Sequence, residues 1–505
     1  MEMTMKTEYD VDILICGAGA SGLTMALELA RRGITFRIIE KLDDPFRGSR
    51  GKGIQPRTQE IFEDLGILDK IVAVGGVYPK QRAYRDDESF VDSDVVEDVG
   101  SSPSEPYHIP LMVPQFLTER VMRDRLAEFG LYPEFGCELL AFDEAKGVVT
   151  ARIARRSGET TIRARYLVGA DGGRSFVRHA LGIGFPGKTL GVRAIVADVT
   201  LTGLGREVWH RFGEGDMQRQ IAICPLAGTD MFQVQGPIPL EGEIDLSAEG
   251  LTALVAERTG RSDIAVLSVS WASAFNMNAR LADHYRVGCT FLVGDAAHTH
   301  PPTGGQGLNT SVQDAYNLAW KLAAVIDGGD DSLLDSYEAE RRPVAEAMLG
   351  LSTGLLDAMK RGDIRRGRSV HQLDIGYPES VLSTEIPPRL GGLLAGDRAP
   401  DAPLMAAAGQ PRRLFDLLTG PHWTLITYAA RQEASSKSRR GLTVHHVGPD
   451  GDLMDNGGHF NRAYGIVDGG TVIIRPDGYV GAIFGKDASS EIDSYLARVG
   501  LGQEA

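Results

Sequence analysis

Three glycines at fixed spacing form the first group of residues that could do chemistry. Gly17, Gly19 and Gly22 lie in the run Gly-Ala-Gly-Ala-Ser-Gly. The first glycine of such a run permits a tight turn, the second lets a diphosphate approach the backbone, and the third lets a helix pack closely on a strand. A helix that begins at Ser21, directly after Ala20, would present free N–H groups to the phosphates, so we assign both residues to the cofactor. The pattern predicts a dinucleotide site.

A carboxylate follows where such a site needs one. Glu40 comes eighteen residues after Gly22 and ends a second apolar run. There it can accept hydrogen bonds from an adenosine ribose. We place the next residue, Lys41, at the cofactor as well. The alternative is a glycine-rich turn with a merely solvated Glu40, but strand, helix and acid together favour the dinucleotide site.

A second ligand-facing loop comes much later in the chain. The apolar run 291–293 predicts a strand that delivers Asp295 at its carboxyl end, where open α/β sheets bind ligands. A glycine-rich loop then leads into a long helix, whose N-terminus can stabilise negative charge. A reduced isoalloxazine ring carries such charge, so FAD fits better than a nicotinamide dinucleotide. The residues of this loop that we assign to the cofactor are Pro302, Gly305, Gly307, Leu308 and Asn309.

Hydrophobic patterns predict the elements that position both loops. Strands at 11–16 and 35–39 flank a helix at 21–32, which makes a β-α-β unit and begins a parallel sheet. A helix at 307–326 has apolar residues at steps of three and four. From 191 to 279 the texture changes to alternating strands, which predicts a mostly antiparallel sheet inserted between pieces of the first domain.

With these motifs the sequence resembles the class A flavoprotein aromatic hydroxylases, the group typified by para-hydroxybenzoate hydroxylase. The resemblance rests on the glycine run at 17–22, the Asp-Gly motif at Asp171, and the Gly-Asp motif that ends at Asp295. The region beyond 387 resembles the thioredoxin-like domain of phenol hydroxylases and polyketide-tailoring hydroxylases. No cysteine lies beyond Cys289, so dithiol redox chemistry is excluded there.

The expected fold class is therefore α/β. It comprises a Rossmann-like FAD-binding domain, an inserted and mostly antiparallel β-sheet substrate domain, and a C-terminal thioredoxin-like α/β domain. We expect the FAD-binding domain at 1–190 and 281–386, the substrate domain at 191–280 and the C-terminal domain at 387–505.

The resemblance also implies roles for single residues. Glu40 would bind the adenosine ribose of FAD and Asp295 its ribityl chain. The backbone of Leu308 and Asn309 would face the pyrimidine edge of the flavin. The other positions that the resemblance assigns to FAD or NAD(P)H are Arg50, Gln115 and Asp171.

The implied activity is that of an FAD-dependent monooxygenase, which uses NAD(P)H and O₂ to hydroxylate a phenolic or polyketide-type aromatic compound through a flavin C4a-hydroperoxide. The middle sheet would cover the substrate. A satisfied, non-catalytic histidine is the favoured alternative at position 210, and a plain core aromatic is the alternative at 275. His298 and His300 are open to a catalytic or a loop-packing role. The candidate catalytic residues are His210, Arg211, Phe275 and Pro302.

Other functions fit part of the pattern. A Baeyer–Villiger or epoxidising enzyme acting on a polycyclic ketone or quinone would share every motif. A flavin halogenase needs a Trp-x-Trp-x-Ile-Pro signature, whereas the four tryptophans here lie far apart. A disulfide reductase needs a redox cysteine pair. From a different class, the chain could be a non-catalytic dinucleotide-binding scaffold.

Composition argues against some classes of binding partner. The net charge of −15 argues against nucleic acid and anionic membranes. The four cysteines lack metal-site spacing, so we expect no metal and predict buried thiols at Cys16 and Cys289. No signal segment or membrane-length apolar run is seen, which favours a cytoplasmic protein. A homodimer is the default expectation.

Overall fold

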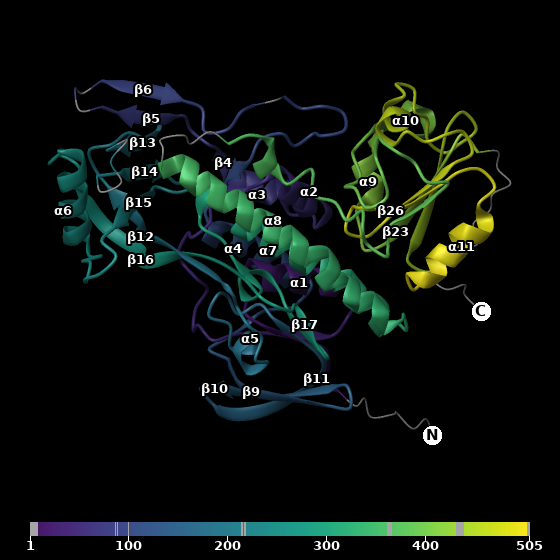
Figure 1. The fold of residues 1–505 in the computed structure, drawn as a ribbon, viewed down its shortest axis with the longest axis horizontal. Coiled ribbons are helices and arrows are strands. Elements are labelled where there is room, and N and C mark those ends of the chain that lie inside the picture. Colours follow the sequence, from purple (N-terminus) through teal and green to yellow (C-terminus); the bar gives the residue numbers. More distant parts are fainter. Residues whose placement is uncertain are drawn as a thin grey trace.

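The computed structural model describes residues 9–501 except 86, 88, 99, 214–215, 217–218, 361–365 and 431–438. Three sheet-based units make up this part of the chain (Figure 1). The first carries the cofactor loops, the second is the inserted middle sheet, and the third is the C-terminal unit. The expected α/β fold class is confirmed.

The first sheet is mostly parallel, as the β-α-β pattern predicts. Strand β1 lies parallel to β2 and β11, and β11 lies parallel to β18. The order is β17 (Arg286–Val287), β18 (Thr290–Leu292), β11 (Gly158–Gly169), β1 (Val11–Cys16), β2 (Phe36–Glu40) and β8 (Glu134–Phe135), with β10 (Val148–Arg155) and β9 (Glu138–Ala145) added beside β11.

Helices cover this sheet and position its loops. Helix α1 (Ala20–Arg31) follows β1 and packs against α7 (Gly307–Ile326) in the main hydrophobic core. Helix α8 (Asp335–Lys360) runs across the molecule in Figure 1 and packs on α7. The remaining elements are α2 (Pro56–Asp64), α3 (Leu68–Val74), α4 (Gln115–Glu128), α5 (Phe176–Ala180) and a small sheet of β3 (Gly53–Ile54), β7 (Leu111–Met112) and β4 (Gly76–Val77).

The middle sheet is antiparallel at every pairing but one and is larger than the sequence predicts. Helix α6 (Ala248–Thr259) covers its outer face, and the inner face lies toward the cofactor loops. Its order is β19 (His298–Thr299), β16 (Val266–Leu281), β12 (Gly187–Leu201), β15 (Phe232–Ile238), β14 (Ile221–Pro225), β13 (Trp209–Phe212), β5 (Gln81–Tyr84) and β6 (Phe90–Ser93).

The expected boundary after 190 falls inside β12, and that after 280 falls inside β16. Strands β5 and β6 join the sheet from the preceding segment, because β5 pairs in parallel with β13. A pairing between segments this far apart leaves no local pattern to detect.

The C-terminal unit is built on a five-stranded mixed sheet. It begins before the expected boundary at 387, because β20 already pairs with β26. The order is β20 (Thr384–Ile386), β26 (Val480–Phe484), β25 (Thr471–Ile474), β23 (Trp423–Tyr428) and β24 (Leu442–Val447), accompanied by β21 (Pro403–Met405), β22 (Pro411–Arg413), α9 (Leu414–Leu418), α10 (His459–Tyr464) and α11 (Ser489–Arg498).

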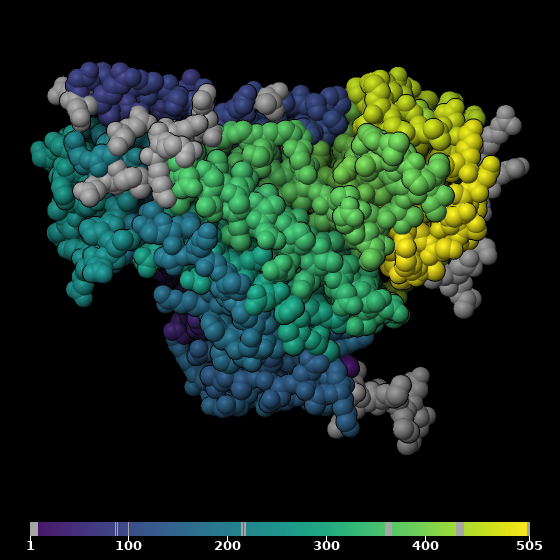
Figure 2. Space-filling model, in the orientation of Figure 1, coloured from purple at the N-terminus to yellow at the C-terminus, as the bar shows by residue number. Residues whose placement is uncertain are grey.

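A buried charge cluster joins this unit to the first one. Arg475 donates to both oxygens of Glu340 on α8 at 2.8 and 2.9 Å, and also pairs with Asp477 at 2.6 Å. Lys321 on α7 donates to Glu340 at 2.7 Å. All four side chains are buried. The space-filling view accordingly shows the C-terminal unit (yellow) packed directly against the rest of the chain (Figure 2).

Among the described residues, no helix combines the length and apolarity needed to cross a membrane.

Cys16 is buried, as predicted. Cys289 is only half-buried, which corrects the expectation of a buried thiol; it sits at the turn between the short strands β17 and β18 at the sheet edge.

Candidate cofactor and substrate site

The glycine run between β1 and α1 has the geometry of a diphosphate cradle. Gly17 has φ +110°, and a Cβ there would lie 2.3 Å from the carbonyl oxygen of Ala170. A Cβ on Gly22 would lie 2.0 Å from the carbonyl oxygen of Gly17. Above Gly19, by contrast, the nearest atom to such a Cβ is Oε1 of Glu119 at 3.8 Å. The backbone is thus open at the one position where a diphosphate must approach.

Glu40 lies at the carboxyl end of β2, beside this cradle. Its Oε2 accepts the N–H of Ala18 and its Oε1 accepts the N–H of Leu42, both at 3.0 Å. The carboxylate is therefore held at the edge of the glycine turn, where an adenosine ribose would meet it. Lys41 is exposed next to it.

Two aspartates end the neighbouring strands. Asp171, after β11, accepts the N–H of Val177 through Oδ2 at 3.1 Å, while its buried Oδ1 has no partner among the described residues. Asp295, after β18, is exposed, yet surrounding protein desolvates it enough to raise the pKa of its carboxyl. The two carboxylates thus fit the polar part of a long cofactor.

The two helix N-termini meet at Gly294. This residue has φ +61°, and a Cβ on it would lie 2.9 Å from Cβ of Ser311 on α7 and 3.0 Å from Oγ of Ser21 on α1. A Cβ on Gly307, in the first turn of α7, would meet no atom within 4 Å. One helix start can therefore hold a diphosphate and the other can face a second group of the same ligand.

The loop before α7 is anchored by a residue that we assigned to the cofactor. The side-chain oxygen of Asn309 accepts the N–H of Gln55 at 2.8 Å, and its Nδ2 donates to the carbonyls of Gly53 and Gly305 at 2.8 and 2.7 Å. The Asn309 side chain is thus fully used by the protein, and only its backbone is left for a ligand. Pro302 is exposed at the start of the loop.

Arg50 and Gln115 lie on the segments that border the glycine run and the middle sheet. The exposed Arg50 guanidinium stacks on Phe46 at 5.4 Å and on Trp271 of β16 at 5.9 Å. Gln115 accepts the N–H of Gly51 at 3.3 Å and donates to Glu119 at 2.8 Å. Both positions fit contacts to a bound cofactor.

Glu119 was missed by sequence reasoning. It is buried 3.8 Å from where a Gly19 Cβ would be, and burial raises its carboxyl pKa to about 7. Its spacing of four from Gln115, on one face of α4, is the signal that could have found it.

The inner face of the middle sheet carries a buried polar row that the sequence also concealed. Asp198, Gln233 and Cys224 are cross-strand neighbours, all fully or almost fully buried. Lys52 reaches this row from the cofactor loop, donating to Gln233 at 2.9 Å and lying 4.4 Å from the Trp209 ring centroid. Desolvation lowers the pKa of Lys52.

The segment that carries Lys52 also touches α7. A Cβ on Gly51 would lie 3.5 Å from Cβ of Leu308. This segment therefore connects the first turn of α7 to the sheet that covers the substrate.

Neighbouring residues of a strand point to opposite faces of the sheet, so the two catalytic candidates on β13 lie on different faces. His210 is buried on the outer face with Tyr84 and Phe212. Its Nδ1 bonds the Tyr84 hydroxyl at 2.9 Å and its Nε2 bonds the Gly205 carbonyl at 2.9 Å. Arg211, one residue on, lies on the inner face and donates to Gln81 at 3.1 Å. This geometry argues against a catalytic role for His210 and leaves Arg211 as the candidate on this strand.

Phe275 and the two later histidines have mainly packing roles. Phe275 lies on the inner face but packs with Val192, Ala194 and Leu356. His298 bonds the buried Asp314 at 2.6 Å and His300 at 3.0 Å. Burial lowers the pKa of His300 to about 3, so this histidine stays neutral. We assign the histidine pair to holding the loop before α7.

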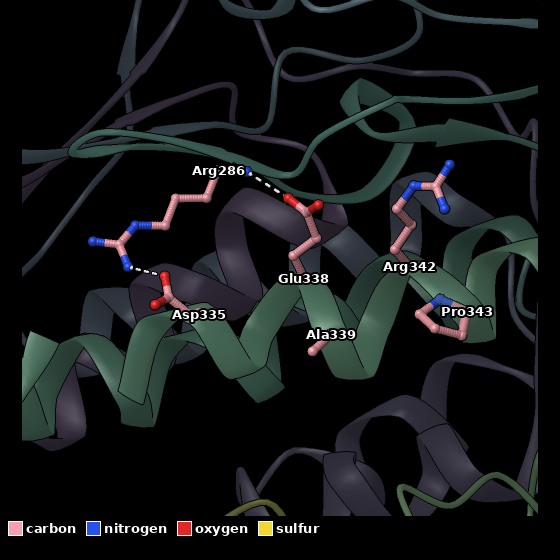
Figure 3. A pocket seen from close by; sticks show the side chains of 6 residues that line it. All are labelled: Arg286, Asp335, Glu338, Ala339, Arg342 and Pro343. Carbon is pink, nitrogen blue, oxygen red and sulfur yellow. Dashed lines mark hydrogen bonds and ion pairs between the residues drawn. The ribbon is translucent and has the colours of Figure 1, made fainter. Parts of the chain in front are cut away.

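A separate groove of about 470 Å³ runs along α8 (Figure 3). The Arg286 guanidinium donates to Asp335 at 2.7 Å, and the backbone N–H of Arg286 donates to Glu338 at 3.4 Å. None of the residues predicted for the cofactor or substrate lines it, and we assign it no chemistry. The lining residues are Arg286, Asp335, Glu338, Ala339, Arg342 and Pro343.

Comparison with known proteins agrees with this geometry. The FAD binding domain family matches residues 10–352, and the aromatic-ring hydroxylase C-terminal family matches residues 393–500. A flavin-dependent monooxygenase of Mycobacteroides abscessus is 40% identical, covering 96% of this chain and 99% of the relative. The 6-methylpretetramide 4-monooxygenase of Streptomyces rimosus is 32% identical, covering 97% and 93%.

A solved structure extends the likeness to the complete fold. Aklavinone-11 hydroxylase, in complex with FAD and aklavinone, superposes with a TM-score of 0.78 at 26% identity, covering 98% of this chain and 99% of the other. The helix N-termini and carboxylates described above lie within the residues that match the FAD binding domain family. The chain belongs to the class A FAD-dependent aromatic-ring hydroxylases.

Proposed function

We propose that this protein uses NAD(P)H and O₂ to hydroxylate a phenolic ring in a multi-ring, polyketide-type aromatic compound. The observation that carries the proposal is the meeting of the α1 and α7 N-termini at Gly294, beside a sheet whose inner face is tied to the same loops through Lys52 and Gln233. A long anionic cofactor and a covered substrate can then lie side by side.

The chain's own residues hold and orient the reactants. When bound, FAD supplies the activated oxygen for the transfer. The α1 N-terminus binds its diphosphate, Glu40 orients the adenosine ribose, and the first turn of α7 stabilises negative charge on the ring. The middle sheet excludes water, and Arg211 favours the phenolate form of the substrate, which reacts faster with an electrophilic oxygen.

Two observations support a multi-ring substrate. The 6-methylpretetramide 4-monooxygenase of Streptomyces rimosus and the hydroxylase in complex with aklavinone both carry names of multi-ring compounds. On the inner face of the sheet, the small residues Ser273 and Ala222 are only half-buried, so a ligand could contact the sheet at both positions. The need for NAD(P)H supports a cytoplasmic site of action.

The test is NAD(P)H oxidation by the FAD-loaded protein with resorcinol, 1-naphthol, 1-hydroxyanthraquinone and aklavinone, measuring peroxide and product together. We expect multi-ring phenols to stimulate oxidation and to gain one hydroxyl group. Oxygen insertion beside a ketone would instead establish Baeyer–Villiger chemistry. A protein that binds no FAD and oxidises no NAD(P)H would be a scaffold, and the proposal would be refuted.

A further inference from the structure

On the inner face of the middle sheet, one row of side chains is buried and the neighbouring row is mostly half-buried. The buried row consists of Asp198, Gln233 and Cys224, and Lys52 contacts it through Gln233. The next row runs across the paired positions of β16, β12, β15, β14 and β13. Most of its members are half-buried, and two are small. In order, they are Ser273, Val196, Gln235, Ala222 and Arg211. Four of the five side chains therefore remain accessible from the inner face, with Gln235 at the centre of the row.

Gln233, in the buried row, fixes the orientation of Gln235. The side-chain amide of Gln233 uses all its hydrogen-bonding positions. Its Nε2 donates to the backbone carbonyl of Ser49 at 2.5 Å and to Asp198 at 3.1 Å. Its Oε1 accepts from Lys52 at 2.9 Å and from Gln235 Nε2 at 2.6 Å.

Amide oxygen and nitrogen atoms are often interchangeable in a structure, but here chemistry decides the assignment. A backbone carbonyl can only accept and a lysine ammonium can only donate, so Gln233 has one allowed orientation. Gln235 faces the oxygen of Gln233 and must therefore donate its NH₂ group to it. Its own Oε1 then points away from Gln233, and it makes no hydrogen bond to a described residue.

We propose that Gln235 is a specificity residue, whose side-chain oxygen accepts a hydrogen bond from a hydroxyl group on the substrate. Lys52 and Gln233 act as positioning residues that keep an acceptor, rather than a donor, facing the substrate. The inference rests on the proposed function and deepens it, because it requires a free O–H on the bound ring system. A ligand that offers only an ether or carbonyl oxygen there would face an oxygen lone pair and lose affinity.

The test compares hydroxylated ligands with their methyl ethers. The probes are 1-naphthol against 1-methoxynaphthalene and 1-hydroxyanthraquinone against 1-methoxyanthraquinone, with Kd read from the change that each causes in the flavin absorbance spectrum. The variants are Gln235→Met, which keeps the volume without the acceptor, and Lys52→Met, which removes the fixed donor to Gln233. Gln410→Leu, an exposed glutamine of the C-terminal unit, is the matched control.

We expect the wild type to prefer each hydroxyl compound over its ether by about 10-fold, corresponding to one hydrogen bond. In Gln235→Met this preference should vanish, with unchanged FAD content. In Lys52→Met it should shrink only in part, because the Ser49 carbonyl and Asp198 still hold the Gln233 amide in its orientation and only the bond that anchors its oxygen is lost. Gln410→Leu should keep the full preference.

Two results would overturn the inference, and they are distinguishable. If Gln235→Met discriminated hydroxyl from ether as strongly as the wild type, Gln235 would not be the acceptor, while the proposed function would stand. If the wild type bound none of the four compounds and none stimulated NAD(P)H oxidation, the proposed function would fail and the inference with it.

Discussion

Removing the charge of Glu340 is predicted to destabilise the whole protein. The buried cluster balances two cations, Lys321 and Arg475, against two carboxylates, Glu340 and Asp477. Glu340→Gln keeps the shape and leaves one positive charge uncompensated. Breaking a buried ion pair in this way typically costs about 3–5 kcal/mol. Lys321, whose pKa burial already lowers to about 8, can escape by losing its proton.

The size of the melting shift depends on how the chain unfolds. Unfolding entropy near 60 °C is about 2.1 cal/mol/K per residue, so a loss of about 4 kcal/mol lowers Tm by about 4 °C if all 505 residues unfold together. If residues 393–500 unfolded alone, the same loss would lower their Tm by about 18 °C. Calorimetry of the FAD-loaded wild type and Glu340→Gln distinguishes the two.

A matched control is Arg152→Met, which breaks the exposed pair of Arg152 with Glu159, whose side chains are 53% and 54% exposed. That change should move Tm by less than about 1 °C, since exposed pairs contribute little. If Glu340→Gln moved Tm no more than Arg152→Met does, the cluster would not hold the units together and the reasoning would be wrong.

Three further changes test the cofactor and substrate assignments. Gly19→Val should lower the FAD content of purified protein at least about 10-fold, read from flavin absorbance, with little change in the Tm of the FAD-free protein, because the space above Gly19 is open to a ligand. FAD affinity should fall as pH rises through about 7, where Glu119 ionises near the diphosphate, and titrations of Glu119→Gln should lack this step. Arg211→Met should lower kcat about 10-fold or more, whereas His210→Phe should lower Tm and leave kcat nearly unchanged; the reverse result would invert the two assignments.

Local signals were enough to predict the strands and helices that carry the cofactor loops. The strand at 11–16 and the helix at 307–326 match β1 and α7 to the residue, and α1 and β2 are each shifted by one residue. Each of these is specified by neighbouring residues, a glycine run or a three-four apolar pattern. The same holds for Glu40 and Asp295, which follow directly from the ends of their strands.

The substrate half depends on pairing between distant segments. Whether His210 or Arg211 faces inward is decided by strand register, and a shift of one residue would exchange them. Lys52 stands in a loop with no periodic pattern, and its partner Gln233 is 181 residues away. The side chain of Asn309, which we assigned to the cofactor, binds protein groups on both sides of the loop.

The turn at 476–478 has a consequence for protein engineering. Its Asp477 carboxylate accepts hydrogen bonds from Asn317 and Trp320 on α7, and its backbone carbonyl accepts one from Arg57 on α2. The C-terminal unit thus holds α2 and α7 in place through this turn. A chimera that exchanges residues 393–500 for those of a relative must keep Arg475 and Asp477, or transplant α7 and α8 with them. Shortening the chain before this turn would leave Lys321 and Glu340 without half of their cluster, although none of the residues predicted for the cofactor lies in the C-terminal unit.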